Sequence, residues 1–394
     1  MPSNESIVIV AAARTPMGGF MGSLSSVPAV KLGAAAIRAA LAKADVANDQ
    51  VDEVLMGCVL TAGMKQAPAR QAALYADVDM STPCTTVSKV CGSGMKAVMQ
   101  GVDSLRLGYN KVVVAGGMES MSNAPYLLPK ARQGMRMGHA QTLDHMMFDG
   151  LENAYDGLAM GCFAQDTADQ KGFSREQMDA FALESLQRAN QAIASGAFSA
   201  EVTPVTFSER RKEVTVDIDE QPGNARPEKI PSLRPAFKKD GTVTAANSSS
   251  ISDGAAALVM MTESEARARG LTPLCKVLGH SSHAQTPETF TAAPVGAINK
   301  LLESINWSVA DVDLFEINEA FAMVTMLAID ELQLDHAKVN IHGGACALGH
   351  PIGASGARIL VTLIHALKNK GLKKGLASLC IGGGEATAVA IEML

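Results

Sequence analysis

The stretch GSGMKAV, residues 92–98, is a Gly-Ser turn that opens an apolar helix, and the chain repeats it as ASGARIL, residues 354–360. Two further pairs of segments keep the same order: VDEVLMG (51–57) with VDLFEIN (312–318), and VAGGMES (114–120) with CIGGGEA (380–386). The spacing is also kept, because Gly57 and Ser93 are 36 residues apart and Asn318 and Ser355 are 37 apart. Repetition of this kind is typical of a duplicated unit of strand, helix and strand.

We therefore expect an α/β fold with two pseudo-symmetric, layered α/β/α halves. The opening strand Ile7–Val10 has its counterpart in Lys276–Gly279. Residues 1–121 together with 247–271 form the first half in this interpretation, 122–246 an inserted loop domain, and 272–394 the second half.

The inserted segment has its own signals. Ser174 and Gln177 match a capping box, which predicts a helix that runs to a stop at Gly196. Four prolines fall between Pro222 and Pro235, so this part is expected to be a loop rather than a helix.

Composition limits the classes of function. The chain has 394 residues, 47% hydrophobic and 19% charged, with a net charge of −6 and only 4% aromatic residues, which argues against a nucleic-acid-binding protein. No apolar stretch approaches the ~20 residues of a membrane span, and the N-terminus lacks the basic start of a signal peptide. The seven cysteines are scattered, without a C-x-x-C pair, so we expect neither disulfides nor a metal site. These features favour a soluble, cytoplasmic protein that does not act at a membrane.

A basic segment, residues 221–239, carries five Lys or Arg against one acid, Glu228. It is either a solvated loop or a binding surface for an anionic small molecule.

The turn at residues 91–94 is suited to chemistry. A β-branched run, Thr85–Val90, leads to Cys91 at the start of the helix, where the dipole and backbone N–H groups favour a thiolate. The duplicate turn has Gly353 in that place but is preceded by His350, and the duplicate strand ends at Cys380.

If the halves pack by pseudo-symmetry, Cys91, His350 and Cys380 converge, with Asn318 nearby. Two thiols and an imidazole without a metal suggest nucleophilic catalysis with a separate proton transfer. The alternatives are a core residue for Cys380, and a helix cap or a core hydrogen bond for His350.

The chain resembles the thiolases. The resemblance rests on VSKVCGSGMKAV, NEAFA, GGACALGHPIGASGAR and CIGGGEATAVAIE, and with VVVAGGMESMSNAPY and DGTVTAANSSSISDGAAAL it covers almost the whole chain. The loop beginning GGMESMSNAPY is similar to that of the biosynthetic, acetoacetyl-CoA branch. The sequence departs from the family pattern at Ala159, where His is frequent, and at His342, where Asn is commoner.

The resemblance implies a role for each catalytic position. Cys91 carries the acyl group, His350 activates it, and Cys380 exchanges a proton with the α-carbon. Asn318 holds a water that stabilises the enolate with His350, and the N–H groups of Cys91 and Gly382 form a second oxyanion hole.

The resemblance also implies the substrate. Two acetyl-CoA give acetoacetyl-CoA and CoA by a ping-pong route, without a further cofactor, in a homotetramer whose contacts include the Met-rich residues 123–150. The implied CoA-binding residues are Leu151, Met160, Arg226, Phe237, Ala245, Ser248, Ser249, Ala320 and Phe321.

Three other functions remain open at this point. One is a 3-ketoacyl-CoA thiolase of broader chain length. The others are a non-catalytic CoA-binding or lipid-carrier protein and a redox-regulated scaffold.

Overall fold

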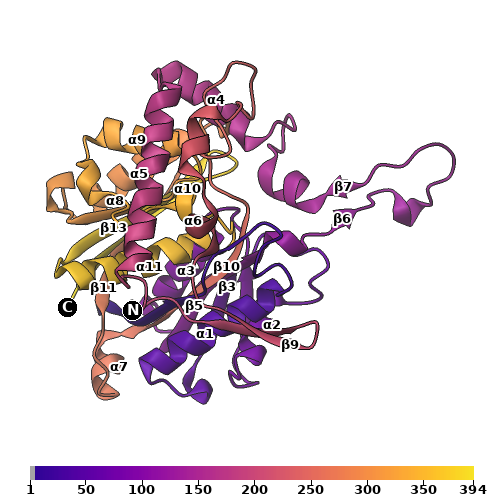
Figure 1. The fold of residues 1–394 in the computed structure, drawn as a ribbon. Helices are drawn as coiled ribbons and strands as arrows, with labels where there is room; N and C mark the ends of the chain where they lie inside the picture. Colours follow the sequence, from indigo (N-terminus) through magenta and orange to yellow (C-terminus); the bar gives the residue numbers. More distant parts are fainter. Residues whose placement is uncertain (1–4) are drawn as a thin grey trace.

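A computed structural model describes residues 5–394. Its centre is one ten-stranded sheet in the order β12-β13-β14-β11-β1-β10-β5-β3-β4, with β2 added beside β10 (Figure 1). The strands are β1 (Ile7–Arg14), β2 (Gly18–Gly19), β3 (Glu53–Gly57), β4 (Cys84–Val87), β5 (Val112–Ser120), β10 (Ser252–Thr262), β11 (Cys275–Ala284), β12 (Leu314–Ile317), β13 (Lys374–Ile381) and β14 (Glu385–Met393).

The sheet confirms the duplication. β1 and β11 meet antiparallel at its middle, and the strands outward from them are equivalent in pairs: β10 with β14, β5 with β13, and β3 with β12. The segments 51–57 and 312–318 contain β3 and β12. The two Gly-Ser turns open α3 (Ser93–Arg106) and α11 (Ser355–Lys370).

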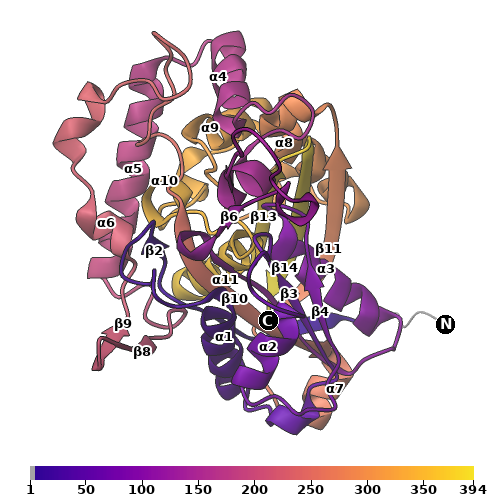
Figure 2. The same cartoon turned by 90° about the vertical axis from the view of Figure 1, so that its right-hand side faces the viewer.

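Helices lie in three layers around the two halves of the sheet. Figures 1 and 2 show α1 (Ala29–Ala44) and α2 (Pro68–Tyr75) on the opposite side of the molecule from α8 (Ala293–Ser304) and α9 (Ala322–Leu332). Between them, α3 and α11 contact each other and strands of the central sheet. Side chains along β1 point alternately to the two faces of the sheet. Ile7 and Ile9 therefore pack into the core around α3 and α11, while Val8 and Val10 pack into the core around α1.

The segment between β5 and β10 adds no strand to the central sheet. It forms two small hairpins, β6 (Tyr126–Leu127) with β7 (Leu143–Asp144) and β8 (Val205–Glu209) with β9 (Lys212–Val216). The first hairpin projects from the body of the molecule (Figure 1). The remaining helices are α4 (Met160–Lys171), α5 (Arg175–Ala194), α6 (Glu220–Asn224), α7 (Glu263–Ala268) and α10 (Ala345–Leu348).

The predicted helix after Ser174 is confirmed as α5. The Ser174 hydroxyl accepts the Gln177 N–H at 3.2 Å, and the Gln177 side chain accepts the Ser174 N–H at 2.9 Å, which completes the capping box.

The proline-rich part is not the plain loop that was expected. It contains α6, with Pro222 in its first turn, and a 3₁₀ helix, Pro227–Ser232, that begins at a proline. Proline is tolerated at these positions because first-turn N–H groups have no partner within the helix. The prediction was wrong because it treated proline as a breaker wherever it stands.

One part of the repeat is out of register. Val54 of β3 lies opposite Val114, and Phe315, its equivalent in β12, lies opposite Leu376. Val114 is therefore structurally equivalent to Leu376 and not to Cys380, with which the sequence motifs had aligned it. The glycine pairs of the two motifs accordingly lie in different kinds of structure. Gly116 and Gly117 lie inside β5, whereas Gly383 and Gly384 form a turn with φ of +93° and +88°.

Within residues 5–394, no helix combines the length and the apolar character needed to cross a membrane.

Candidate active site

Cys91 stands on a tight turn between β4 and α3. The strand ends at Val87, earlier than the β-branched run suggested, and Val90 has a left-handed φ of 44°. A β-branched residue rarely adopts this conformation, so the turn is strained and is held by its surroundings. The Ser93 hydroxyl bonds the Val90 carbonyl at 2.6 Å and accepts the Lys89 N–H at 2.8 Å.

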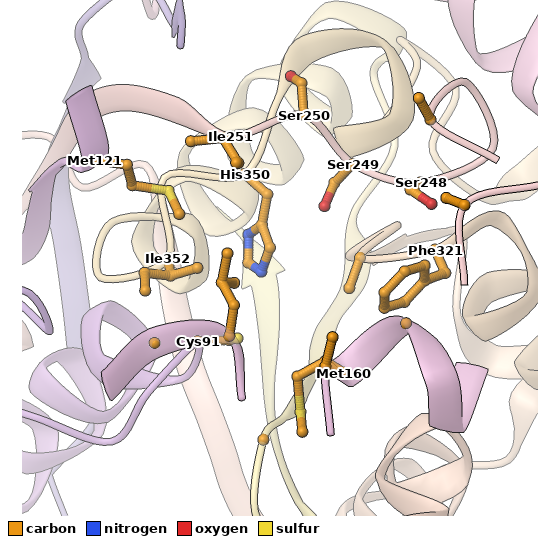
Figure 3. A pocket seen from close by; sticks show the side chains of 18 of the residues that line it. Cys91, Met121, Met160, Ser248, Ser249, Ser250, Ile251, Phe321, His350 and Ile352 are labelled. Atoms are coloured by element: carbon orange, nitrogen blue, oxygen red, sulfur yellow. The ribbon is translucent and has the colours of Figure 1, made fainter. Parts of the chain in front are cut away.

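A cavity of about 500 Å³ opens beside this turn (Figure 3). Cys91 comes from the first half of the chain, while His350 and Cys380 come from the second half, and all three line the cavity. The predicted positions that line it are Cys91, Leu151, Met160, Phe237, Ala245, Ser248, Ser249, Ala320, Phe321, His350, Cys380 and Gly382. Two predicted positions do not: Asn318 lies behind His350, and Arg226 is exposed outside the lining.

His350 is held from behind and open in front. Its Nδ1 lies 2.6 Å from the Ser355 hydroxyl and 3.4 Å from the Asn318 amide nitrogen. Its Nε2 is buried and has no hydrogen-bond partner among the described residues. Burial, and then the nearby Arg358 guanidinium, lower the pKa of His350 to about 3, so the imidazole is neutral at physiological pH.

Cys91 is half-buried at the cavity wall. The N–H groups of Gly382 and of Cys91 itself lower the pKa of its thiol, but burial outweighs them and raises it to about 11. The backbone N–H groups thus act in the expected direction, but they do not make Cys91 a resting thiolate. Desolvation of a charge on the cavity wall costs more than two N–H groups return.

Cys380 is the most deeply buried of the three, with 1% of its surface exposed at the end of β13. Burial, and then the neighbouring Cys91, raise the pKa of its thiol well above the ordinary value. The site thus holds two neutral thiols and one neutral imidazole, a set that moves protons only when a substrate reacts.

A charged group supports Asn318. The Arg358 guanidinium is fully buried and donates to Asn318 Oδ1 at 3.5 Å, and its other side lies 3.8 Å from the Glu316 carboxylate. Burial raises the pKa of Glu316 to about 8, against the opposing effect of Arg358. Asn318 therefore sits between His350 and a buried arginine.

Glu119 is a site-supporting residue that sequence reasoning named only as part of the repeat. Its carboxylate accepts the N–H groups of Gly353, Val59 and Leu60 at 2.8, 3.0 and 3.2 Å. It therefore ties the loop after β3 to the loop that carries His350. Burial raises the pKa of Glu119 to about 7. Glu119 is far in sequence from the residues it binds, so no local sequence pattern predicts these hydrogen bonds.

The two departures from the family pattern lie in different places. Ala159 lines the cavity, whereas His342 is buried outside the lining, edge-on to Phe198 at 5.7 Å between ring centres. Among residues 5–394, no cluster of three His, Cys, Asp or Glu is arranged to hold a metal ion.

The five basic side chains of residues 221–239 are exposed. Lys238 pairs with Asp169 at 2.5 Å. Phe237, within the same segment, lines the cavity, so this basic surface begins at the cavity wall.

Known protein families match this chain over almost its whole length. Residues 7–264 match the family model "Thiolase, N-terminal domain", and residues 271–393 match "Thiolase, C-terminal domain". The chain is 48% identical over 389 residues to an acetyl-CoA acetyltransferase of Pseudomonas aeruginosa, covering 98% of this chain and 99% of that protein. It is 50% identical over 391 residues to acetyl-CoA acetyltransferase 2 of Arabidopsis thaliana, covering 98% and 97%.

Solved structures agree. The Acat5 thiolase of Ascaris suum in complex with coenzyme A is 42% identical, with a TM-score of 0.94 over 99% of this chain and 100% of that one. The acetyl-CoA acetyltransferase of Bacillus anthracis is also 42% identical, with a TM-score of 0.97 over the whole of both chains. With both family models matched and this identity over nearly its full length, the chain belongs to the thiolase family.

Proposed function

We propose that this thiolase is an acetyl-CoA acetyltransferase, which converts two acetyl-CoA to acetoacetyl-CoA and CoA and catalyses the reverse cleavage. The observation that carries the proposal is the meeting of Cys91, His350 and Cys380 in one cavity, beside the backbone N–H of Gly382. The names of the relatives from Pseudomonas aeruginosa and Arabidopsis thaliana support the same activity.

The first half-reaction loads the enzyme. Cys91 Sγ attacks the thioester carbonyl of acetyl-CoA while His350 Nε2 takes the thiol proton. The tetrahedral intermediate then collapses to acetyl-Cys91, and the departing CoA sulfur takes the proton from His350. Because the pKa of Cys91 is about 11, the proton moves during the attack and not before it.

The second half-reaction forms the carbon–carbon bond. His350 Nε2 first takes the thiol proton of Cys380. The Cys380 thiolate then removes a proton from the methyl group of a second acetyl-CoA, and the enolate attacks the carbonyl of acetyl-Cys91. The Cys91 sulfur leaves and takes the proton held by His350, and acetoacetyl-CoA is released. Asn318, through a water, and His350 stabilise the enolate oxygen, while the N–H groups of Cys91 and Gly382 stabilise the oxygen of the tetrahedral intermediate. Two thiols are required because the sulfur of Cys91, once acetylated, is a thioester sulfur and no longer acts as a base for the α-proton.

Coenzyme A would lie along the cavity wall. The pantetheine contacts we propose are Leu151, Met160, Phe237, Ala245, Ser248, Ser249, Ala320 and Phe321, all of which line the cavity. Arg226 and its basic neighbours would meet the nucleotide phosphates from outside. CoA thioesters are the substrates, and we propose no further cofactor.

We also propose a homotetramer in the cytoplasm. The projecting β6–β7 hairpin exposes Met137 at 99% and Tyr126 at 69%, an apolar content suited to contact with a second copy. The free cysteines, with a nucleophile among them, suit a reducing compartment.

The experiment is to expose the protein to acetyl-CoA, measure its mass, and map the modified residue. One acetyl group on Cys91, discharged by CoA, is the expected result. A protein that binds CoA but never becomes acetylated would be a non-catalytic carrier, and acetylation elsewhere would overturn the assignment of the nucleophile. Equal rates on four-carbon and longer 3-ketoacyl-CoA would favour the broader-chain activity.

A further inference from the structure

The hydroxyl group of Ser355 contacts the back of the His350 ring. Ser355 Oγ lies 2.6 Å from His350 Nδ1 and 2.9 Å from the carbonyl oxygen of Pro351. Ser355 and His350 are both buried, so bulk water does not compete for these bonds. On the other side of the ring, Nε2 faces the cavity without a protein partner among residues 5–394 (Figure 3).

Counting hydrogens assigns the direction of these bonds. A hydroxyl group has one hydrogen, and a carbonyl oxygen only accepts. If the Ser355 hydroxyl donates to Pro351, its remaining lone pair accepts from His350, and Nδ1 carries the ring proton. The lone pair of the neutral imidazole is then on Nε2, where a proton acceptor for Cys91 is needed.

The duplicated half of the chain supports this direction independently. Ser93 stands at the same place as Ser355, as the first residue of the equivalent helix. Its hydroxyl donates to the Val90 carbonyl at 2.6 Å and accepts at 2.8 Å from the Lys89 backbone N–H, which is always a donor. The imidazole Nδ1–H of His350 takes the place of that backbone N–H in the second half.

The other neighbour of Nδ1 cannot replace Ser355. Arg358 donates to Asn318 Oδ1, which turns the amide nitrogen of Asn318 toward the ring at 3.4 Å. An amide nitrogen only donates, so this contact by itself favours an unprotonated Nδ1. At 3.4 Å it is much longer than the 2.6 Å contact with the Ser355 hydroxyl, which therefore decides where the ring proton lies.

We propose that Ser355 is a positioning residue that holds His350 in the Nδ1–H tautomer and so directs its basic nitrogen at Cys91. The kinetic consequence rests on the proposed function, whereas the tautomer itself does not. Ser355 acts through His350 and is not itself a catalytic residue.

The direct test is NMR of the resting protein labelled with ¹⁵N-histidine, with the His350 signals assigned by their loss in His350→Asn. Wild-type protein should show a protonated Nδ1 and an unprotonated Nε2. In Ser355→Ala the buried Nδ1–H loses its acceptor, so the proton should move toward Nε2. An Nε2–H tautomer in the wild-type protein overturns the proposal, and this reading needs neither a variant of Ser355 nor any activity.

The kinetic test compares acetylation and alkylation of Cys91. Ser355→Ala should lower kcat and the rate of Cys91 alkylation by iodoacetamide about 10- to 100-fold, with little change in KM, because a misdirected base loses part of the roughly 10²–10⁴-fold that a general base contributes. Ser355→Thr, which keeps the hydroxyl, should restore most of the rate.

Ser281→Ala is the matched control. The Ser281 hydroxyl is also buried and also donates to a carbonyl, that of Ala297 at 2.6 Å, but within residues 5–394 it makes no hydrogen bond to an imidazole. It should lose stability without slowing alkylation. If both alanine variants slow alkylation equally, Ser355 has only a structural role. If the tautomer and alkylation behave as expected while acetyl-CoA gives no acetyl-Cys91, the proposed function fails and the inference stands.

Discussion

At the scale of single residues, the proposed mechanism assigns the roles of nucleophile and base to two side chains of the same chemical type. Cys91 and Cys380 are both thiols with raised pKa values, and both line the cavity with His350. We assign the attack to Cys91 because the N–H groups of Gly382 and of Cys91 itself favour its thiolate. Cys380, at the end of β13, is assigned only to proton transfer and does not carry the acyl group. Their division of labour can be tested separately.

Cys380→Ser should retain acetyl transfer and lose condensation. The variant should still form acetyl-Cys91 and exchange acetyl between CoA thiols, because neither step touches an α-carbon. Carbon–carbon bond formation should fall by about 10²–10⁴, since a serine hydroxyl is a far poorer proton exchanger than a thiol. Cys91→Ser should fail at acetylation itself. Equal loss of both reactions in Cys380→Ser would contradict the division.

Glu119→Gln should weaken the loop that carries His350. A glutamine has one acceptor oxygen where the carboxylate has two, and its NH₂ group would face the N–H donors of Val59, Leu60 and Gly353. A buried unsatisfied donor costs about 1–3 kcal/mol, so urea unfolding should show a loss of this size. Acetylation should slow as well, because His350 loses its fixed position. A variant as stable and as active as wild type would show that Glu119 does not anchor the loop.

At the scale of elements, the two central helices bring the catalytic turns together because small residues let them approach. A methyl group on Gly356 of α11 would lie 2.6 Å from the Met95 backbone nitrogen of α3, and one on Gly94 would lie 3.0 Å from the Ala357 nitrogen. Cys91 precedes α3 and His350 precedes α11, so the distance between the two helices sets the distance between their turns.

Gly356→Ala should therefore push the helices apart. Overpacking against backbone costs about 1–3 kcal/mol, measurable by urea unfolding, and the acetylation rate should fall with it. Gly223→Ala is the control, because an added methyl group there meets no atom within 4 Å. A loss of stability without any loss of acetylation would show that helix spacing does not set the site.

The basic segment should act through its charge. Neutralising Arg226, Lys229 and Lys239, which are exposed, should raise KM for acetyl-CoA more than for a pantetheine thioester without the nucleotide. Added salt should have the same effect on the wild-type enzyme, because exposed charges are screened. Lys238 is left unchanged because it pairs with Asp169. Equal increases on both substrates would contradict a phosphate contact.

At the scale of the whole molecule, burial of ionisable groups between the halves couples stability to pH. The pKa of His350 is lowered to about 3, and the pKa values of Glu119 and Glu316 are raised to about 7 and 8. Between about pH 3 and 6.5 the unfolded chain binds the His350 proton and the folded protein does not, so the free energy of unfolding rises with pH. Between about pH 4.5 and 8 the folded protein holds the carboxyl protons, so these two groups lower it as pH rises.

From these three groups, stability should be greatest near pH 4.5, fall below it, and fall above it up to about pH 8. The decline should steepen at about pH 6.5, where the opposing effect of His350 ends, as measured by urea unfolding across this range. Glu316→Gln, which mimics the protonated carboxyl, should make the alkaline decline shallower. An unchanged slope between pH 6.5 and 8 in that variant would mean that Glu316 is already ionised in the folded protein.

Local patterns in the sequence were enough to predict the duplication, the two helices that start at Ser93 and Ser355, and the meeting of Cys91, His350 and Cys380. They succeed because turn residues, helix caps and the spacing of apolar positions act over a few residues, and the repeat carries them into the second half. The resemblance to the thiolases added Gly382 and eight CoA-binding positions that line the cavity.

Tertiary structure alone decided the protonation states and the supports of the site. The raised pKa of Cys91, the anchoring of Gly353 by Glu119, and the orientation of Asn318 by Arg358 depend on burial or on contacts between residues distant in the chain. Which residues of β5 and β13 occupy equivalent positions in the two halves was likewise decided only by their pairing with β3 and β12. Desolvation and long-range hydrogen bonding leave no periodic trace in a sequence, because they arise only when the two halves close on each other.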